Sequence, residues 1–230
     1  MIVFGSIVTL AIFLFVGWAV STEMFQHRAW RRRVEQGDVD IVGALIEEAL
    51  AAWRRARPPA GLPANVWAAV QGAQLVAVMP DGATVSTAAE GEFRSEGNQR
   101  LQVTSAVDEA IAAAAKLADM MMYDVPNLRL GSVRVDVYSS FTGPDGAPTQ
   151  QPILTTTVER AIADALSWDA LTPAEVLGRF DTVYQRGPLG QPVAIDLPPI
   201  EGNAPRPTGE AAAEFAAQQA AARAHPKGSH

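Results

Sequence analysis

The sequence is poor in the residues that most often carry catalysis or bind transition metals, with no cysteine and only three histidines. Without cysteine the chain has no disulfide bonds, thiolate metal ligands, iron–sulfur clusters or cysteine nucleophiles. The histidines lie near the two ends of the chain, at His27, His225 and His230. Because the base of a Ser-His-Asp triad is a histidine, the middle of the chain cannot supply one.

Phosphate-binding motifs are absent as well, since neither GxxxxGKS/T nor GxGxxG occurs. Lys116 is the only lysine outside the C-terminal tail, and its alanine-rich surroundings favour a solvated side chain on a helix. Carboxylates alone would favour Mg²⁺ or Ca²⁺, but the Asp-x-Asp-x-Asp-Gly spacing of a calcium loop is missing. The candidate ligands are Asp108, Glu109, Asp119, Asp124 and Asp136. We therefore expect no cofactor, no bound metal and no catalytic residue.

One long apolar stretch opens the chain. Residues 2–20, IVFGSIVTLAIFLFVGWAV, are 19 residues without a charge. A helix of that length spans about 28 Å, close to the hydrocarbon thickness of a bilayer. We predict a transmembrane anchor over residues 1–21, with Trp18 at the membrane interface. A cleaved signal peptide is the alternative, because Ala19-Val20-Ser21 is a small-x-small triplet, but no basic residue precedes the apolar run.

A basic juxtamembrane segment follows over residues 22–37. The positive-inside rule places it on the cytoplasmic side of the cell (inner) membrane, with the N-terminus outside and a single pass between them. We expect its aromatic and basic side chains to lie at headgroup level, near anionic lipid. A plain stop-transfer anchor explains the arginines, and a specific anionic-lipid site is the alternative. The interface residues are Trp30, Arg28, Arg31, Arg32 and Arg33.

The rest of the chain is acidic. The first 60 residues hold seven basic and six acidic side chains, whereas residues 61–230 hold eleven and nineteen. Binding to nucleic acid needs a basic face, so we expect no nucleic-acid partner.

Residues 38–197 are predicted to form an α+β domain with a mostly antiparallel sheet packed by helices. Helices are expected at 38–57, 63–71, 105–123, 156–166 and 172–180. Strands are expected at 73–79, 83–89, 128–141, 152–157, 183–184 and 193–195, with a second hairpin across 91–105. The apolar side of the first helix is predicted to be Ile41, Ala44, Leu45, Ala49 and Ala52.

Three local patterns add detail to this prediction. Thr156-x-x-Glu159 and Thr172-x-x-Glu175 are capping boxes, which predict helix starts. Arg134 and Asp136, with Tyr138 next in the row, are the most suggestive polar cluster. An ion pair, either on a solvated strand face or across strands, is the expected explanation for it.

Two features are candidate partner contacts. Met120, Met121 and Met122 form an adaptable apolar triplet near a helix end, for which core filling is the alternative interpretation. Residues 198–230 form a proline- and alanine-rich extended tail whose only large aromatic side chain is Phe215. We expect this tail to bind a partner.

The element order between residues 39 and 167 is similar to that of roadblock/longin-type and profilin-like domains. This resemblance implies partner binding and identifies no site residue. The expected function is a non-catalytic accessory subunit of a membrane protein complex, with integral-membrane partners. A membrane-tethered regulatory or signalling module is the second hypothesis, and an enzyme with a carboxylate site is the third.

Overall fold

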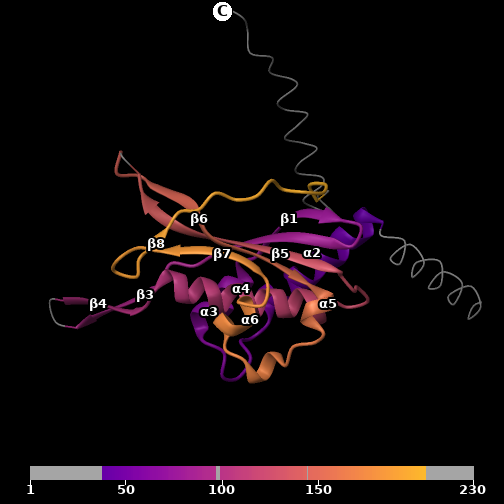
Figure 1. Cartoon of the computed structure of the whole chain (residues 1–230), viewed down its shortest axis with the longest axis horizontal. Helices are drawn as coiled ribbons and strands as arrows, with labels where there is room; N and C mark the ends of the chain where they lie inside the picture. Colours follow the sequence, from indigo (N-terminus) through magenta and orange to yellow (C-terminus); the bar gives the residue numbers. More distant parts are fainter. Residues whose placement is uncertain (1–37, 97–98, 144, 206–230) are drawn as a thin grey trace, which may run out of the picture.

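A six-stranded sheet packed by helices organises the residues that the structure describes, 38–96, 99–143 and 145–205 (Figure 1). In this computed structural model the strand order is β1-β2-β5-β6-β7-β8, and β3 pairs with β4 in a separate two-stranded sheet. The strands are β1 (Gln74–Met79), β2 (Gly82–Ala88), β3 (Glu92–Glu96), β4 (Gln99–Thr104), β5 (Ser132–Thr142), β6 (Pro148–Glu159), β7 (Asp181–Arg186) and β8 (Pro192–Val193). The helices are α2 (Val39–Arg55), α3 (Ala64–Gln71), α4 (Ala106–Tyr123), α5 (Arg160–Ala163) and α6 (Pro173–Leu177), with a 3-10 turn η1 (Trp168–Ala170).

The large sheet is antiparallel at every pair except β2–β5, which confirms the predicted mixed α+β domain with a mostly antiparallel sheet. The β3–β4 hairpin and α4 carry the chain between these two parallel strands, as a parallel connection requires. Both predicted hairpins form. Met79 pairs with Gly82, so Pro80 and Asp81 make the whole first turn.

The predicted membrane anchor lies outside the described residues, as does the basic segment with Trp30 and its arginines. The same holds for Trp18 and for the tail from residue 206, which includes Phe215. Among the residues that the structure describes, no helix is both long and apolar enough to cross a membrane. The anchor, its orientation and the headgroup contacts therefore stay predictions.

Helix α2 forms where it was predicted, but a different side of it is buried. Ala44 and Ala52 are exposed, contrary to the predicted apolar face. The large apolar side chains Ile46, Leu50 and Trp53 lie four, eight and eleven residues after Val42, and they bury more apolar area than Ala44 and Ala52 would. The helix therefore turns these residues to the core: Val42, Ile46, Ala49, Leu50 and Trp53.

Helix α4 lies at the centre of the core. Ser105 caps it by accepting a hydrogen bond from the Asp108 amide at 3.1 Å. The small alanines along the helix allow it to approach β5 closely, where Val135 is fully buried. Met120, Met121 and Met122 are at most 4% exposed and belong to this core. Their burial matches the core-filling interpretation, so they do not lie on the surface of the domain.

The helix predicted over residues 156–166 is wrong in its first half. Thr156 and Val158 belong to β6, where they pair with Val135 and Val133 of β5. The expected capping box does not form, because the β-branched run Thr155–Val158 favours the sheet and the Thr156 hydroxyl hydrogen-bonds that of Thr182 on β7. Only the short helix α5 follows.

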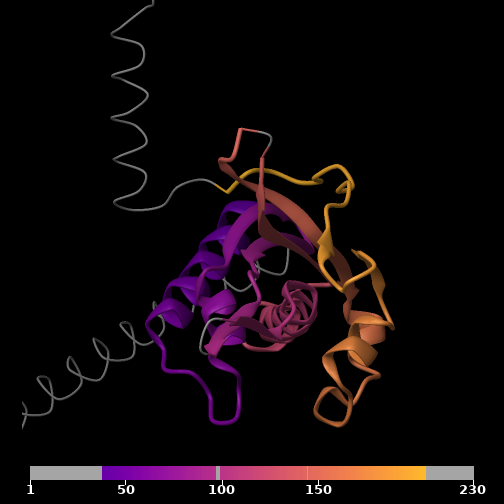
Figure 2. The ribbon, with the colours of Figure 1, turned by 90° about the vertical axis from the view of Figure 1, so that its left-hand side faces the viewer.

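The sheet face opposite α4 is crossed by an extended segment, residues 195–203, here called the strap. Figure 2 shows it passing over the sheet on the side away from α4. It begins beside β6, where the Ile195 amide donates to the Pro152 carbonyl at 2.9 Å. It ends at β1, where Asn203 pairs with Val78. Residues 198–203, predicted as part of an extended tail, thus lie against the domain.

Candidate functional site

A groove runs along the exposed side of α4, between α3 and α6. Its floor is a row at helical spacing, Ala112, Ala115, Lys116 and Asp119. One wall comes from the start of α3 and the other from the segment between η1 and α6. The groove encloses about 280 Å³. Its wall residues are mostly apolar: Leu62, Pro63, Val66, Trp168, Leu171, Pro173 and Val176.

Trp168 separates this groove from a second hollow of about 560 Å³. The two hollows have three lining residues in common, Asp119, Trp168 and Asp169. Its indole Nε1 donates to the Ala163 carbonyl at 3.1 Å. Its ring meets the Tyr123 ring edge-on, with centroids 6.1 Å apart. These contacts fix the indole from two sides, so the groove has a rigid aromatic wall before anything binds.

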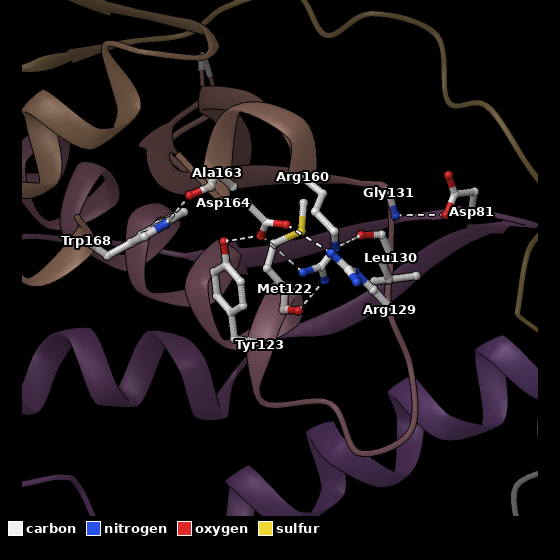
Figure 3. A network of polar contacts seen from close by, with 10 residues as sticks. All are labelled: Asp81, Met122, Tyr123, Arg129, Leu130, Gly131, Arg160, Ala163, Asp164 and Trp168. Carbon is white, nitrogen blue, oxygen red and sulfur yellow. Dashed lines mark hydrogen bonds and ion pairs between the residues drawn. The ribbon is translucent and has the colours of Figure 1, made fainter. Parts of the chain in front are cut away.

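Arg160 lies at the centre of a network of polar contacts next to Tyr123 and Asp164, two residues that line the second hollow (Figure 3). Its Nε donates to the Leu130 carbonyl at 2.6 Å, and its Nη2 donates to the Met122 carbonyl in the last turn of α4. Its guanidinium lies over the Tyr123 ring, 5.3 Å from the centroid. One side chain thus satisfies two carbonyls and orients the tyrosine that packs on Trp168.

Asp164 is the acidic partner in the same network. It accepts a hydrogen bond from the Tyr123 hydroxyl at 3.0 Å and another from Arg129 Nη2 at 3.1 Å. Burial and the Asp164 carboxylate together raise the pKa of Tyr123 above its usual value, because both disfavour the phenolate. Tyr123 therefore stays a neutral hydrogen-bond donor at neutral pH.

The rim of the two hollows is acidic. Asp119 forms an ion pair with Lys116 at 2.7 Å, and Asp164 is paired with Arg129. Asp169 is exposed and has no polar partner within the described ranges. Lys116 offsets Asp119, and Asp164 is offset by Arg129 and by Arg160 at 3.6 Å, so the charge of Asp169 favours a cationic side chain there over an anionic one.

Asp124 adds a negative charge at the C-terminal end of α4, where the helix dipole is also negative. Partial burial is the main cause that raises the pKa of Asp124 above its usual value, and repulsion from Asp119 adds to it. The folded domain therefore binds this proton more tightly than the unfolded chain does. Ionisation of Asp124 accordingly costs stability as the pH rises through the folded-state pKa.

Replacing Asp124 with asparagine should raise the free energy of unfolding at pH 7 by about 0.3–1 kcal/mol. The gain should vanish near pH 3, because the Asp124 carboxyl of the wild type is then protonated and as neutral as the asparagine side chain. Urea unfolding at the two pH values measures both effects. Asp181→Asn, at an exposed aspartate on β7, is the control and should change little. An equal gain at pH 3 would contradict the electrostatic cause.

The structure does not gather the sequence-predicted chemistry into one site. Lys116 and Asp119 do meet in the groove. Asp136 lies on the other side of the sheet under the strap, and Asp108 pairs with Arg186. No three side chains that could hold a metal ion lie together within the residues described.

Sequence reasoning missed Trp168, Tyr123 and Arg160 as a unit. Trp168 follows a short connection after α5, and only the folded chain brings it against α4. A tryptophan between Asp164 and Asp169 was the available signal, since isolated aromatics in polar connections often bind other surfaces.

Searches for related proteins found no family model, no curated protein and no solved structure that matches this chain. The similarity in element order to roadblock/longin-type domains therefore stays a prediction.

Proposed function

We propose that this protein is a non-catalytic accessory subunit of a membrane protein complex, tethered by its N-terminal segment and bound to its partner through the groove along α4. The observation that carries the proposal is the groove itself. It offers apolar walls, a floor of two alanines beside the Lys116–Asp119 ion pair, a fixed tryptophan and an acidic rim on the surface of the domain.

The volume of the groove matches one or two apolar side chains of a partner. Burying a single leucine or phenylalanine contributes about 1.5–3 kcal/mol. The walls rest on packed helices and Trp168 is fixed by its own contacts, so little conformational entropy is lost when a partner binds. A small groove of this kind can serve as an anchor point within a larger interface.

The proposed membrane tether strengthens such a weak anchor. Two proteins held in one membrane meet at a high effective concentration, which raises the occupancy of a site without new contacts. An integral-membrane partner with a cytoplasmic segment suits this arrangement. Anionic headgroups at the basic segment would hold the domain close to the bilayer.

The test is purification of the full chain from its native membrane in mild detergent, with mass spectrometry of the proteins that co-elute. Ala112→Arg places a large side chain on the groove floor. Ala52→Arg, at an exposed position on α2, is the matched control. We expect a stoichiometric set of membrane proteins with the wild type and the control, and at least a tenfold loss with Ala112→Arg.

Both variants should melt within about 2 °C of the wild type, because neither position is in the core. Equal retention of the membrane partners by both variants would contradict the groove as the binding surface. Elution of the wild type as a lone monomer or dimer would reject the accessory-subunit proposal. That outcome would favour the regulatory or signalling module with cytoplasmic partners.

A further inference from the structure

The strap is hydrogen-bonded to the sheet at three separate points, each through a backbone group of the strap. The Ile195 amide donates to the Pro152 carbonyl on β6, and Arg134 Nη1 donates to the Pro199 carbonyl at 3.0 Å. At the far end, Asn203 and Val78 exchange two hydrogen bonds of 2.9 Å. The strap therefore spans the sheet from β6 across β5 to β1.

Little of the strap is buried. Ile195 is 8% exposed and is its only buried side chain, whereas Ile200 is 53% exposed. One anchoring side chain and a row of backbone hydrogen bonds are how an extended peptide binds to a receptor. A core element would bury a regular row of side chains, as β5 does.

The surface beneath the strap has unused binding capacity. Arg134 Nε donates to Asp136 at 2.9 Å, and the Thr155 hydroxyl donates to the same carboxylate oxygen at 2.6 Å. The Arg134 side chain is 9% exposed. Its Nη2 is the one buried side-chain polar atom in the described part of the chain that has no hydrogen-bond partner. A ligand with a second acceptor at this point would satisfy Arg134 better than the strap does.

The edge of β1 completes the surface. Strand β1 pairs with β2 on one side, and its other edge shows a single pair in the described residues, Val78 with Asn203. An incompletely paired edge strand accepts a further extended segment through its backbone.

We propose that this face of the sheet is a binding site for an extended peptide, and that the strap is its exchangeable, self-supplied occupant. A partner segment replaces the strap by presenting three features. These are an apolar side chain at the place of Ile195, an acceptor pair for Arg134 at the place of Pro199, and backbone pairing to Val78. This site is separate from the groove, so each can be tested without the other.

The loop before the strap allows a direct test. The Gly187 amide donates to the Gln191 carbonyl at the base of a tight turn, and Leu189 at its tip is 91% exposed. A protease recognition sequence inserted at Leu189 in the full chain would allow the chain to be cleaved before the strap after folding. Only noncovalent contacts then hold the strap on the sheet. A fluorescent peptide of residues 191–205 is then added to the nicked protein and to the intact protein.

We expect the nicked protein to take up the peptide and the intact protein to exclude it. Peptides with Ile195→Asp or Asn203→Pro should bind at least tenfold more weakly, because they lose the apolar anchor or the N–H that pairs with Val78. Glu201→Ala, at an exposed strap residue, should bind within twofold of the original. Failure of a folded nicked protein to bind the peptide, or equal binding of all four peptides, would overturn the proposal.

Hydrogen exchange on the intact chain gives an independent answer, whatever the nicked protein does. An exchangeable strap opens without unfolding the core. The amides of Ile195 and Val78 should then exchange at least tenfold faster than the amides of α4. Exchange of these two amides only together with α4 would show that the strap is a fixed part of the fold, and would overturn the proposal.

Discussion

Replacing Asp136 with leucine should lower the free energy of unfolding by about 3–5 kcal/mol, the usual cost of leaving one partner of a buried ion pair alone. Asp136 is 1% exposed, and Arg134 is 8% exposed beside it. Without the carboxylate, the guanidinium remains buried and keeps only the Pro199 carbonyl as a partner. Urea unfolding followed by circular dichroism measures the loss.

The double variant Arg134→Met, Asp136→Leu is the informative companion. Removing both charges also removes the desolvation penalty, so this variant should recover most of the loss, to within about 1–2 kcal/mol of the wild type. A double variant no more stable than Asp136→Leu alone would contradict the buried pair as the cause. Thr155 then needs its own replacement by valine, because its hydroxyl loses its acceptor in both variants.

An exposed ion pair supplies the control for burial. Arg186 and Asp108 lie 2.6 Å apart with about half of each side chain exposed. The hydrogen bond from Arg186, helped by that from Ser105, lowers the pKa of Asp108. Arg186→Met should nevertheless cost at most about 1 kcal/mol, because water screens exposed pairs. Any effect should disappear in acid, since this contribution is complete above the unfolded-state pKa of Asp108 and is lost as the pH falls through its lowered folded-state pKa.

Local signals in the sequence predicted the parts of the fold that local interactions determine. Thr172 and Glu175 form the full capping box, because all of its hydrogen bonds lie within four residues. The turn at Pro80 and Asp81 is equally local. At Thr156 the same motif predicted a helix that does not form. Pairing with β5 and the hydroxyl contact to Thr182 stabilise the strand more than a capping box would stabilise the start of a helix.

Long-range contacts explain what the sequence could not reveal. The strap has the proline-rich composition of a linker. Its contacts with Val78, Arg134 and Pro152, all distant in the sequence, place it on the sheet. Arg134 and Asp136 were predicted to form an ion pair on a solvated strand face; the ion pair forms, but the solvated setting is wrong, because both side chains are buried. Their burial follows from the strap and could not be predicted without it. The groove likewise depends on Trp168 reaching α4.

Replacing Arg160 with methionine should lower the free energy of unfolding by about 2–4 kcal/mol, because two carbonyls lose their donor, each at about 1–3 kcal/mol if it stays unsatisfied. Met122 and Leu130 are at most 2% exposed, so water does not readily replace the guanidinium there. Arg160→Lys should rescue the stability only in part, since an ammonium group lacks the planar fork that reaches both carbonyls. Thermal unfolding of the wild type, Arg160→Lys and Arg160→Met measures their stabilities, which should fall in that order.

Arg129→Met is the matched control, since Arg129 belongs to the same network through Asp164 but its side chain is 76% exposed. It should cost at most about 1 kcal/mol. Arg160 also orients Tyr123, so Arg160→Met should loosen Trp168 and weaken partner retention by the groove, whereas Arg129→Met should not. A variant at Arg160 that unfolds more easily yet keeps the partner fully would separate the stability of the network from the shape of the groove. It would show that α3 and α6 alone position the surface that binds.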